Sequence, residues 1–318
     1  MSEAPPISVV FATHNRAGRL EALFESLRAQ TFAGGFEVVV VDDASGDRTP
    51  EVLAAEVERG ELRLTTRRMD RSLGPAAARN AAWRVATGEL VVFTDDDCVA
   101  EPGWLEAIAA AAAESPGAIV QGTTSPAPGE LGDLGVFSRT LEVTKLGPWF
   151  QTCNIAYPRA VLEEVGGFDA DTFATPGGED TDLAWRAMDA GAGAVLAADA
   201  RVHHAVNHFG PVGSIRFPLR WSDPMAIFRL HPGLREQLHR GIFWKRSHEL
   251  LYRAALGLAL ARRFPPAALL AYPYLRDAVL RTRRAGSPPT HAPFVVAQDL
   301  VEAYATIRGA AKHRVLVL

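Results

Sequence analysis

The sequence predicts an α/β protein with a doubly wound, mostly parallel sheet and a helical C-terminal extension. Over the first 120 residues, short apolar runs alternate with segments whose apolar residues recur at helical spacing. Strands that are buried on both faces and separated by helices have this pattern. Polar side chains follow three of the apolar runs, and Leu- and Ala-rich stretches broken by arginine pairs make up much of the last hundred residues.

Each element of the N-terminal part follows from its own pattern. Apolar runs predict four strands, at Ile7–Ala12, Glu37–Val41, Glu61–Thr66 and Glu89–Thr94. Three helices are predicted between them: one on the stripe Leu20, Leu23, Phe24 and Leu27 that ends near Thr31, one at Thr49–Arg59, and an Ala-rich one at Pro75–Thr87. A further strand is predicted at Ala194–Ala197.

The composition is that of an ordinary folded chain. The 318 residues are 48% hydrophobic and 22% charged, and Gly and Pro follow no period. These proportions exclude collagen-like, coiled-coil and disordered classes. The length suits one large domain or two modest ones.

Charge is unevenly distributed along the chain. Residues 231–318 contain 14 Lys and Arg against 5 Asp and Glu, whereas residues 1–230 have a net charge of −13. The acidic part argues against a nucleic-acid partner. Cys98 and Cys153 are too few for a disulfide framework and too far apart for a zinc site, and no secretory signal precedes the first strand. We therefore expect a cytoplasmic location.

Polar side chains gather where the predicted strands end. Thr13–Arg16 follows the first strand, Asp42–Ser45 the second, and Asp95–Asp97 the strand that begins at Glu89. In a doubly wound sheet the carboxyl ends of the parallel strands form the ligand-binding edge. Three consecutive carboxylates crowd like charges together, which favours a bound cation over a merely solvated turn.

These segments resemble glycosyltransferase family 2, whose members have the GT-A fold. The resemblance covers about residues 5–210 and rests on five segments in matching order: Ile7–Arg16, Val39–Ser45, Gly74–Asn80, Phe93–Asp97 and Gly178–Arg186. It implies a GT-A catalytic domain at 1–210, with a nucleotide-binding half at about 1–120 and an acceptor half at about 121–210, followed by a mainly helical region at 211–318. The glycine-rich signatures of dinucleotide-binding and phosphate-loop proteins are missing from the sequence.

The resemblance implies a nucleotide-sugar donor at the strand ends. Asp42 is implied to lie beside the base, where a carboxylate accepts the N3–H of uracil or thymine or the N1–H of guanine. UDP is therefore favoured as the donor nucleotide, followed by TDP or GDP. Ala12, where many family members have Pro, and Thr13 are implied to line the base pocket. The remaining implied donor contacts are Arg16, Arg79, Asp95 and Asp96.

The resemblance also implies a divalent cation, Mg²⁺ or Mn²⁺, between the protein and the donor phosphates. Asp97 is implied as its principal ligand, with Asp96 near both the ribose and the metal. One histidine of the pair His203-His204 is implied as a further ligand, and His204 is favoured. Carboxylate oxygens suit these hard cations.

An acceptor hydroxyl needs a base within hydrogen-bond reach. Gly177–Asp180 precedes a predicted helix whose apolar side continues to Met188 and which ends near Gly191. By resemblance Asp180 is the base and Glu179 binds the acceptor. Acidic residues also cap helix N-termini, and the two roles are compatible.

The C-terminal region predicts helices. Its longest uncharged apolar runs, Ala254–Ala261 and Phe264–Leu275, are flanked by basic clusters and are far shorter than the roughly 20 residues of a spanning helix. Such helices suit the inner face of an anionic membrane, but also packing on the catalytic unit or on a second subunit of a homo-oligomer. A last helix is predicted at Phe294–Arg308.

The resulting hypothesis is a metal-dependent, inverting glycosyltransferase. Its partners would be a nucleotide-sugar donor and a saccharide, lipid-linked or small-molecule hydroxyl acceptor, with no nucleic acid. A sugar-phosphate nucleotidyltransferase is the enzymatic alternative, although its Gly-rich phosphate loop is missing after the first strand. A catalytically inactive GT-A-like binding scaffold is the alternative from another class.

Overall fold

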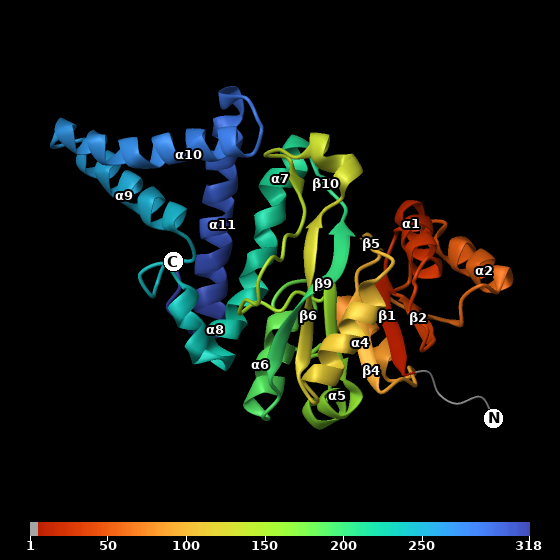
Figure 1. The fold of residues 1–318 in the computed structure, drawn as a ribbon. Coiled ribbons are helices and arrows are strands. Elements are labelled where there is room, and N and C mark those ends of the chain that lie inside the picture. The colour runs from red at the N-terminus through yellow and green to blue at the C-terminus, as the bar shows by residue number, and fades with distance from the viewer. Residues whose placement is uncertain (1–5) are drawn as a thin grey trace. The chain divides into compact units, whose positions relative to one another are not determined.

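The computed structural model describes residues 6–318, whose ribbon is drawn in Figure 1. The chain divides into two compact units. The first comprises the chain up to Gly129 together with Thr140–Ala205, and the second comprises Glu130–Arg139 and Val206–Leu318. The motifs place a boundary at residue 210, whereas the second unit begins at Val206 and also takes in the segment 130–139.

The first unit is built on one eight-stranded sheet. Its strands are β1 (Ile7–Thr13), β2 (Phe36–Asp42), β3 (Leu64–Arg68), β4 (Leu90–Thr94), β5 (Cys98–Ala100), β6 (Ile119–Pro126), β8 (Asn154–Pro158) and β9 (Ala194–His204). Its α-helices are α1 (Ala17–Arg28), α2 (Thr49–Arg59), α3 (Pro75–Trp83), α4 (Trp104–Glu114), α5 (Arg159–Val165) and α6 (Glu179–Asp189). The strand order is β3-β2-β1-β4-β8-β6-β9-β5.

Four of the seven strand pairings are parallel, namely β3-β2, β2-β1, β1-β4 and β6-β9. The predicted fold class, an α/β sheet with mostly parallel pairing, is confirmed. The pairings of β8 with β4 and β6, and of β5 with β9, are antiparallel. The apolar pattern does not predict β5, β6 or β8, because β5 has only three residues, polar residues follow the first two positions of β6, and the apolar run of β8 is limited to Ile155–Tyr157.

The core lies on both faces of the sheet because its central strands carry apolar side chains in both directions. Val9 and Phe11 of β1 pack with α1 in one cluster, and Val10 packs with α3 and α6 in another. Successive side chains of a strand point to opposite faces. A run of consecutive apolar residues therefore serves both layers.

Several boundaries differ from those expected. The third strand lies at Leu64–Arg68 rather than 61–66, and the Ala-rich helix ends at Trp83 rather than 87. The strand expected at 194–197 continues to His204, with an irregularity in its pairing opposite Gly122 and Thr123. This extension forms because the second half of β9 pairs with β6 on one side and with β5 on the other.

The second unit is mainly helical, as its composition predicts. Its α-helices are α7 (Gly210–Arg216), α8 (Ile227–Leu230), α9 (Arg246–Leu260), α10 (Tyr272–Arg284) and α11 (Ala292–His313), joined by the 3-10 helices η2 (Phe217–Ala226), η3 (Pro232–Gln237), η4 (Pro265–Ala271) and η5 (Pro289–His291). The short strands β7 (Ser138–Arg139) and β10 (Asn207–His208) pair antiparallel. The 3-10 helix η1 (Pro128–Asp133) precedes β7.

The core of this unit joins α9, η4, α10 and α11 through buried side chains that include Leu250, Tyr274 and Ala303. Figure 1 shows α9 and α10 side by side, extending away from α11 as a helical hairpin. Among residues 6–318, none of the helices combines the length and the apolar character that a transmembrane span requires.

Candidate active site

The ends of β1, β2 and β4 lie at one edge of the sheet. Thr13 pairs with Asp42 in the β1-β2 register, and Val10 pairs with Phe93 in the β1-β4 register. Because all three strands run parallel, the segments that follow them meet at this edge, as the sequence predicts. Thr13 is buried and Ala12 is half-buried at the end of β1.

Asp42 is a buried carboxylate with two partners at the end of β2. Its Oδ1 accepts a hydrogen bond from the Ser45 backbone N–H at 2.9 Å. Its Oδ2 accepts one from Arg68 Nη1 at the end of β3. Arg68 also donates to the Ser45 carbonyl, so the guanidinium holds the Asp42 turn from one side. Each carboxylate oxygen keeps a second lone pair for a ligand.

Asp43 lies in the candidate site, although the sequence alone indicates no role for it. Its carboxylate accepts hydrogen bonds from the backbone N–H groups of Leu73 and Gly74 and from the Ser72 hydroxyl. It therefore fixes the loop that leads into α3. The only signal in the sequence is its place as the second Asp of a pair, which does not distinguish it from an ordinary turn residue.

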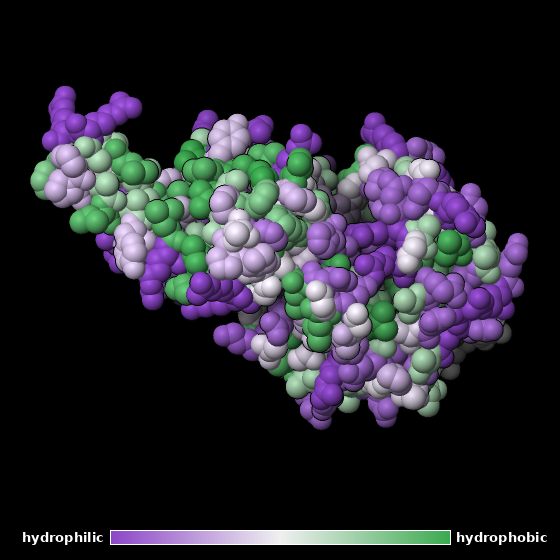
Figure 2. Space-filling view, turned by 90° about the horizontal axis from the view of Figure 1, so that it is seen from above, coloured by the Kyte–Doolittle hydropathy of each residue, from purple (hydrophilic) through white to green (hydrophobic). Residues whose placement is uncertain are grey.

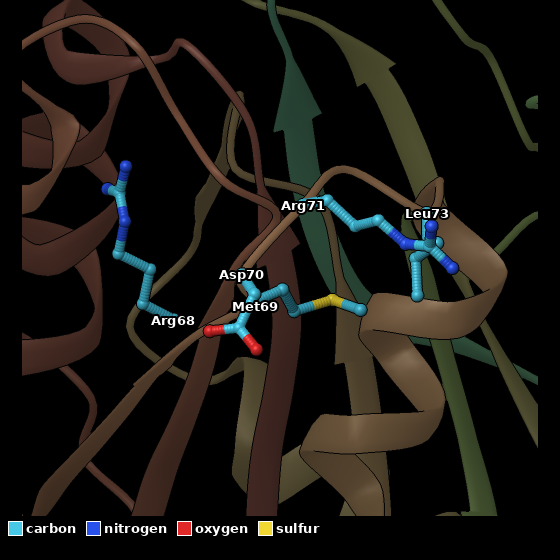
Figure 3. A pocket seen from close by; sticks show the side chains of 5 residues that line it. All are labelled: Arg68, Met69, Asp70, Arg71 and Leu73. Atoms are coloured by element: carbon cyan, nitrogen blue, oxygen red, sulfur yellow. The ribbon is translucent and has the colours of Figure 1, made fainter.

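A pocket of about 560 Å³ opens beside this loop. It is lined by Arg68, Met69, Asp70, Arg71 and Leu73. Figure 3 shows the Arg71 side chain reaching toward Leu73, with Arg68 on the far side of Asp70. The size is within the range of small-molecule sites in proteins. The lining carries both signs of charge, from Arg71 and Asp70, while the guanidinium of Arg68 is paired with Asp42 and the Ser45 carbonyl.

Arg79 joins two parts of the site that lie far apart in sequence. From α3, its Nη2 donates to Asp95 Oδ1 at 2.7 Å and its Nη1 donates to Glu179 Oε1 at 3.2 Å. Asp95 follows β4, and Glu179 begins α6. The guanidinium is buried and its Nε has no hydrogen-bond partner in the protein. The neighbouring carboxylates keep the pKa of Arg79 above its ordinary value although burial opposes this.

Asp96 and Asp97 lie beside Arg16. Arg16 Nε is 3.7 Å from Asp96 Oδ1, and its Nη2 is 3.6 Å from Asp97 Oδ2. Both carboxylates are buried. Burial, and then the charge of Asp97, raise the pKa of Asp96 to about 7. A cation beside the pair would remove this penalty on the ionised form.

His204 and His203 point to different partners because side chains alternate along β9. His204 Nε2 lies 3.4 Å from Asp97 Oδ1, and its Nδ1 donates to the Ala205 carbonyl at 2.8 Å. His203 instead contacts Ser125 Oγ and Glu101. In neutral His204 the proton on Nδ1 leaves a lone pair on Nε2, which is the form that binds metals.

The residues present at Asp97 fit a divalent cation. Potential ligand atoms of Asp97, Cys98 and His204 lie within 4.8 Å of one another. Burial raises the pKa of the Cys98 thiol well above its ordinary value, and its Sγ donates to the Cys153 carbonyl at 3.8 Å. Thiolate sulfur is a soft ligand, whereas Mg²⁺ and Mn²⁺ favour hard oxygen donors such as carboxylates. The fitting donors are therefore the carboxylate and the imidazole.

Glu179 and Asp180 differ in their surroundings at the start of α6. Glu179 is buried, and its Oε2 accepts from the Gly177 backbone N–H at 2.6 Å while Oε1 meets Arg79. Asp180 is half-buried, and its Oδ1 accepts from the Thr181 backbone N–H at 2.8 Å. Burial and the neighbouring Glu179 raise the pKa of Asp180. Glu179 thus holds the loop and Arg79, whereas the pKa of Asp180 lies above that of an ordinary aspartate.

Comparison with known proteins identifies the family. Residues 8–175 match the model for glycosyl transferase family 2. The chain is 30% identical over 285 residues to validoxylamine A glucosyltransferase of Streptomyces hygroscopicus subsp. jinggangensis, a match that covers 76% of this chain and 66% of that protein. It is 30% identical to a pre-mycofactocin glycosyltransferase of Mycobacterium tuberculosis over 58% of this chain and 40% of that protein. The chain thus spans less than two thirds of the length of these relatives.

Solved structures share the fold. A mannosyltransferase from Pyrobaculum calidifontis, in complex with GDP-Man and Mn²⁺, superposes with a TM-score of 0.58 and 24% identity, over 98% of this chain and 88% of that one. Residues 1–349 of S. aureus TarS, in complex with UDP-GlcNAc, superpose with a TM-score of 0.52 and 20% identity, over 97% of this chain and 92% of that one. The GT-A fold predicted from the motifs is confirmed.

Proposed function

The chain belongs to glycosyl transferase family 2, and we propose that it moves a sugar from a nucleotide-diphosphate sugar to an acceptor hydroxyl by metal-assisted, inverting displacement with Asp180 as the base. The observation that carries this proposal is the bridge made by Arg79. It ties Asp95, on the donor side, to Glu179, the neighbour of Asp180. The bridge would thereby hold the proposed donor site and the proposed base close to one another.

The donor would lie along the ends of β1, β2 and β4. Asp42 keeps free lone pairs to accept an N–H from uracil, thymine or guanine, which favours UDP, then TDP or GDP. In the neighbouring pocket, the guanidinium of Arg71 offers a positive charge to an anionic ligand at this edge. Ala12 and Thr13 would border the base, and Arg16 and Asp96 would border the ribose and the phosphates.

Asp97 and His204, with Asp96 beside them, would hold Mg²⁺ or Mn²⁺. Their support is the 3.4 Å approach of Asp97 and His204 and the tautomer that the Ala205 carbonyl imposes. When bound, such a cation supplies Lewis-acid stabilisation of the charge on the departing diphosphate. Arg16 adds a fixed positive charge next to both aspartates.

Asp180 would take the proton of the acceptor hydroxyl. Its raised pKa makes it a stronger base than an exposed aspartate, and Thr181 N–H holds one of its oxygens. Direct attack by the hydroxyl on the sugar, opposite the diphosphate, breaks the bond to the leaving group in the same step and inverts the anomeric centre. Glu179 positions Arg79 and the Gly177 loop, through which it would shape the acceptor side.

The test is an Asp180→Asn variant compared with wild type and with Asp171→Asn, an exposed aspartate of the preceding loop. A panel of UDP, TDP and GDP sugars with saccharide, lipid-linked and small hydroxyl acceptors first identifies a turnover. We expect kcat to fall about 10²- to 10⁴-fold in Asp180→Asn, with nucleotide binding unchanged by calorimetry and Asp171→Asn unaffected.

The same samples separate the alternatives. Retention at the anomeric centre, or full activity of Asp180→Asn, would contradict the proposed mechanism. Pyrophosphate release from a nucleoside triphosphate and a sugar phosphate would indicate a nucleotidyltransferase. Nucleotide binding without turnover of any donor would indicate a binding scaffold. Binding that needs Mn²⁺ and is lost in Asp97→Ala would support the metal site.

A further inference from the structure

The hairpin of α9, η4 and α10 exposes an unusual amount of apolar surface. Six of its large apolar side chains have more than half of their surface exposed: Leu256, Leu258, Phe264, Leu269, Tyr272 and Leu275. Figure 2 shows apolar side chains over much of this projecting hairpin. Large exposed apolar patches are rare on soluble proteins, and where they occur they usually mark a site of interaction with another protein, a ligand or a membrane.

The charge of the same stretch has one sign. Residues 256–275 contain two charged side chains, Arg262 and Arg263, and no Asp or Glu. Both arginines are exposed at the turn between α9 and η4. Farther along α10, Arg276, Arg283 and Arg284 are also exposed. Asp277 of α10 is paired with Arg281, so the exposed charges of the hairpin tip and of α10 named here are arginines, which complement a surface that is apolar and anionic.

The apolar surface wraps around the hairpin instead of forming one flat face. Leu256 and Leu258 are both exposed although they are two positions apart on α9, which separates their directions by about 200°. Phe264 and Leu269 extend the exposed set across the turn and η4. One flat partner would cover one side of the hairpin, whereas the fluid boundary between headgroups and acyl chains can surround a hairpin tip that enters it.

The hairpin is nevertheless a well-packed structure. Leu250, Leu251 and Ala254 of α9 pack with Ala271 and Tyr274. Gly257 allows the closest approach, because a Cβ there would lie 2.6 Å from both the Ala267 carbonyl oxygen and Leu270 Cβ. The exposed leucines are therefore on the outside of an ordered element, and their exposure does not reflect a missing hairpin core.

From these observations we propose that the tip of this hairpin, residues 256–275, docks on the surface of an anionic lipid bilayer. The apolar side chains enter the interface between headgroups and acyl chains, and Arg262 and Arg263 contact the lipid phosphates. The hairpin lies in the interface and does not span the bilayer. This inference is independent of the sugar transferred.

The experiment is flotation of the full chain with phosphatidylcholine vesicles, with and without phosphatidylglycerol. Two double variants test the two contributions: Phe264→Gln with Leu269→Gln, and Arg262→Gln with Arg263→Gln. The matched control is Val57→Gln with Arg63→Gln, which removes one exposed apolar and one exposed basic residue of the first unit. We expect wild type and control to float with the anionic vesicles, and each hairpin variant to lose about tenfold or more in partitioning.

A second measurement locates the contact. Cys98 and Cys153 are both buried, so an environment-sensitive dye attached to Leu269→Cys reports on the tip alone. Its emission should shift to the blue on addition of anionic vesicles, and the dye on Val57→Cys should not respond. Vesicle binding that the hairpin variants leave unchanged would overturn the proposal. Failure of the wild type to bind anionic vesicles would also overturn it. If, in that case, wild type is a dimer in solution and the hairpin variants are monomers, the apolar tip is instead a dimer contact.

Discussion

Arg79 is a buried cation held between carboxylates from two elements. Replacing it by Met leaves Asp95 and Glu179 without this partner, and breaking a buried pair in this way costs roughly 3–5 kcal/mol of unfolding free energy. Arg79→Lys should recover part of the stability, but one ammonium cannot reproduce the geometry of the guanidinium. Denaturant titration measures both variants.

Arg84→Met is the control for Arg79, since Arg84 is an exposed arginine just after the same helix. Its contacts with the Trp83 ring and the Gly166 carbonyl lie at the surface, so the change in unfolding free energy should be no more than about 1 kcal/mol. Equal stability of Arg79→Met and wild type would show that the bridge does not hold the site together.

Asp180 should give activity a dependence on pH. A base acts in its deprotonated form, and burial with the nearby Glu179 raises the pKa of Asp180. We therefore expect kcat/KM to be constant at high pH and to fall as the pH drops through this raised pKa, before ordinary carboxylates become protonated. The pH–rate profile measures this, with Asp171→Asn giving the same curve as wild type. Activity that persists unchanged down to about pH 4 would contradict the assignment.

At the scale of elements, the packing of α11 on η2 depends on Gly309. A Cβ at Gly309 would overlap the Ser222 carbonyl oxygen and come within 2.8 Å of Met225 Cγ. Gly-to-Ala changes inside helices usually stabilise by about 1 kcal/mol. Here we expect Gly309→Ala to destabilise, because backbone and a buried methionine must move.

Gly18 in α1 is the matched control for Gly309. It is exposed, and a Cβ there would meet nothing within 4 Å. Gly18→Ala should leave the melting temperature unchanged or raise it, while Gly309→Ala lowers it in the same thermal scan. A rise in both variants would show that α11 and η2 are not closely packed.

At the scale of the whole molecule, acid should weaken the helical unit through Glu302. Burial alone would raise its pKa, but the contacts with His248 and Lys245 outweigh burial and lower it from 4.5 to about 2. A carboxyl whose folded pKa is depressed stabilises the fold above its unfolded pKa. This contribution, roughly 3 kcal/mol, should disappear as the pH falls from about 4.5 to about 2.

Glu302→Gln tests that contribution. It removes the charge while keeping a group that accepts from Trp244 Nε1, which donates to Glu302 at 3.0 Å. The variant should be less stable near neutral pH, and its stability should vary less with pH between about 4.5 and 2. Circular dichroism during urea unfolding at several pH values measures both. Identical pH dependence in variant and wild type would contradict the assignment.

The sequence by itself determined the central strands and the edge at which Thr13, Asp42 and Asp95–Asp97 meet. Apolar runs that bury both faces identify β1, β2 and β4, and parallel pairing then brings their ends together without further information. Local patterns were weaker for β6, which is apolar only at its first two positions, and for β8, whose apolar run has three residues. They were also weaker for the exact ends of β3 and α3.

Only the tertiary structure decided which side chains face one another across the site. The pairing of Cys98 with His204 between β5 and β9 turns His204, and not His203, toward Asp97. The contact of Arg79 with Glu179, 100 positions along the chain, likewise has no local signature. Periodicity fixes how side chains alternate within an element. Which of its faces meets a distant element depends on long-range strand register and packing, and these are properties of the folded chain as a whole.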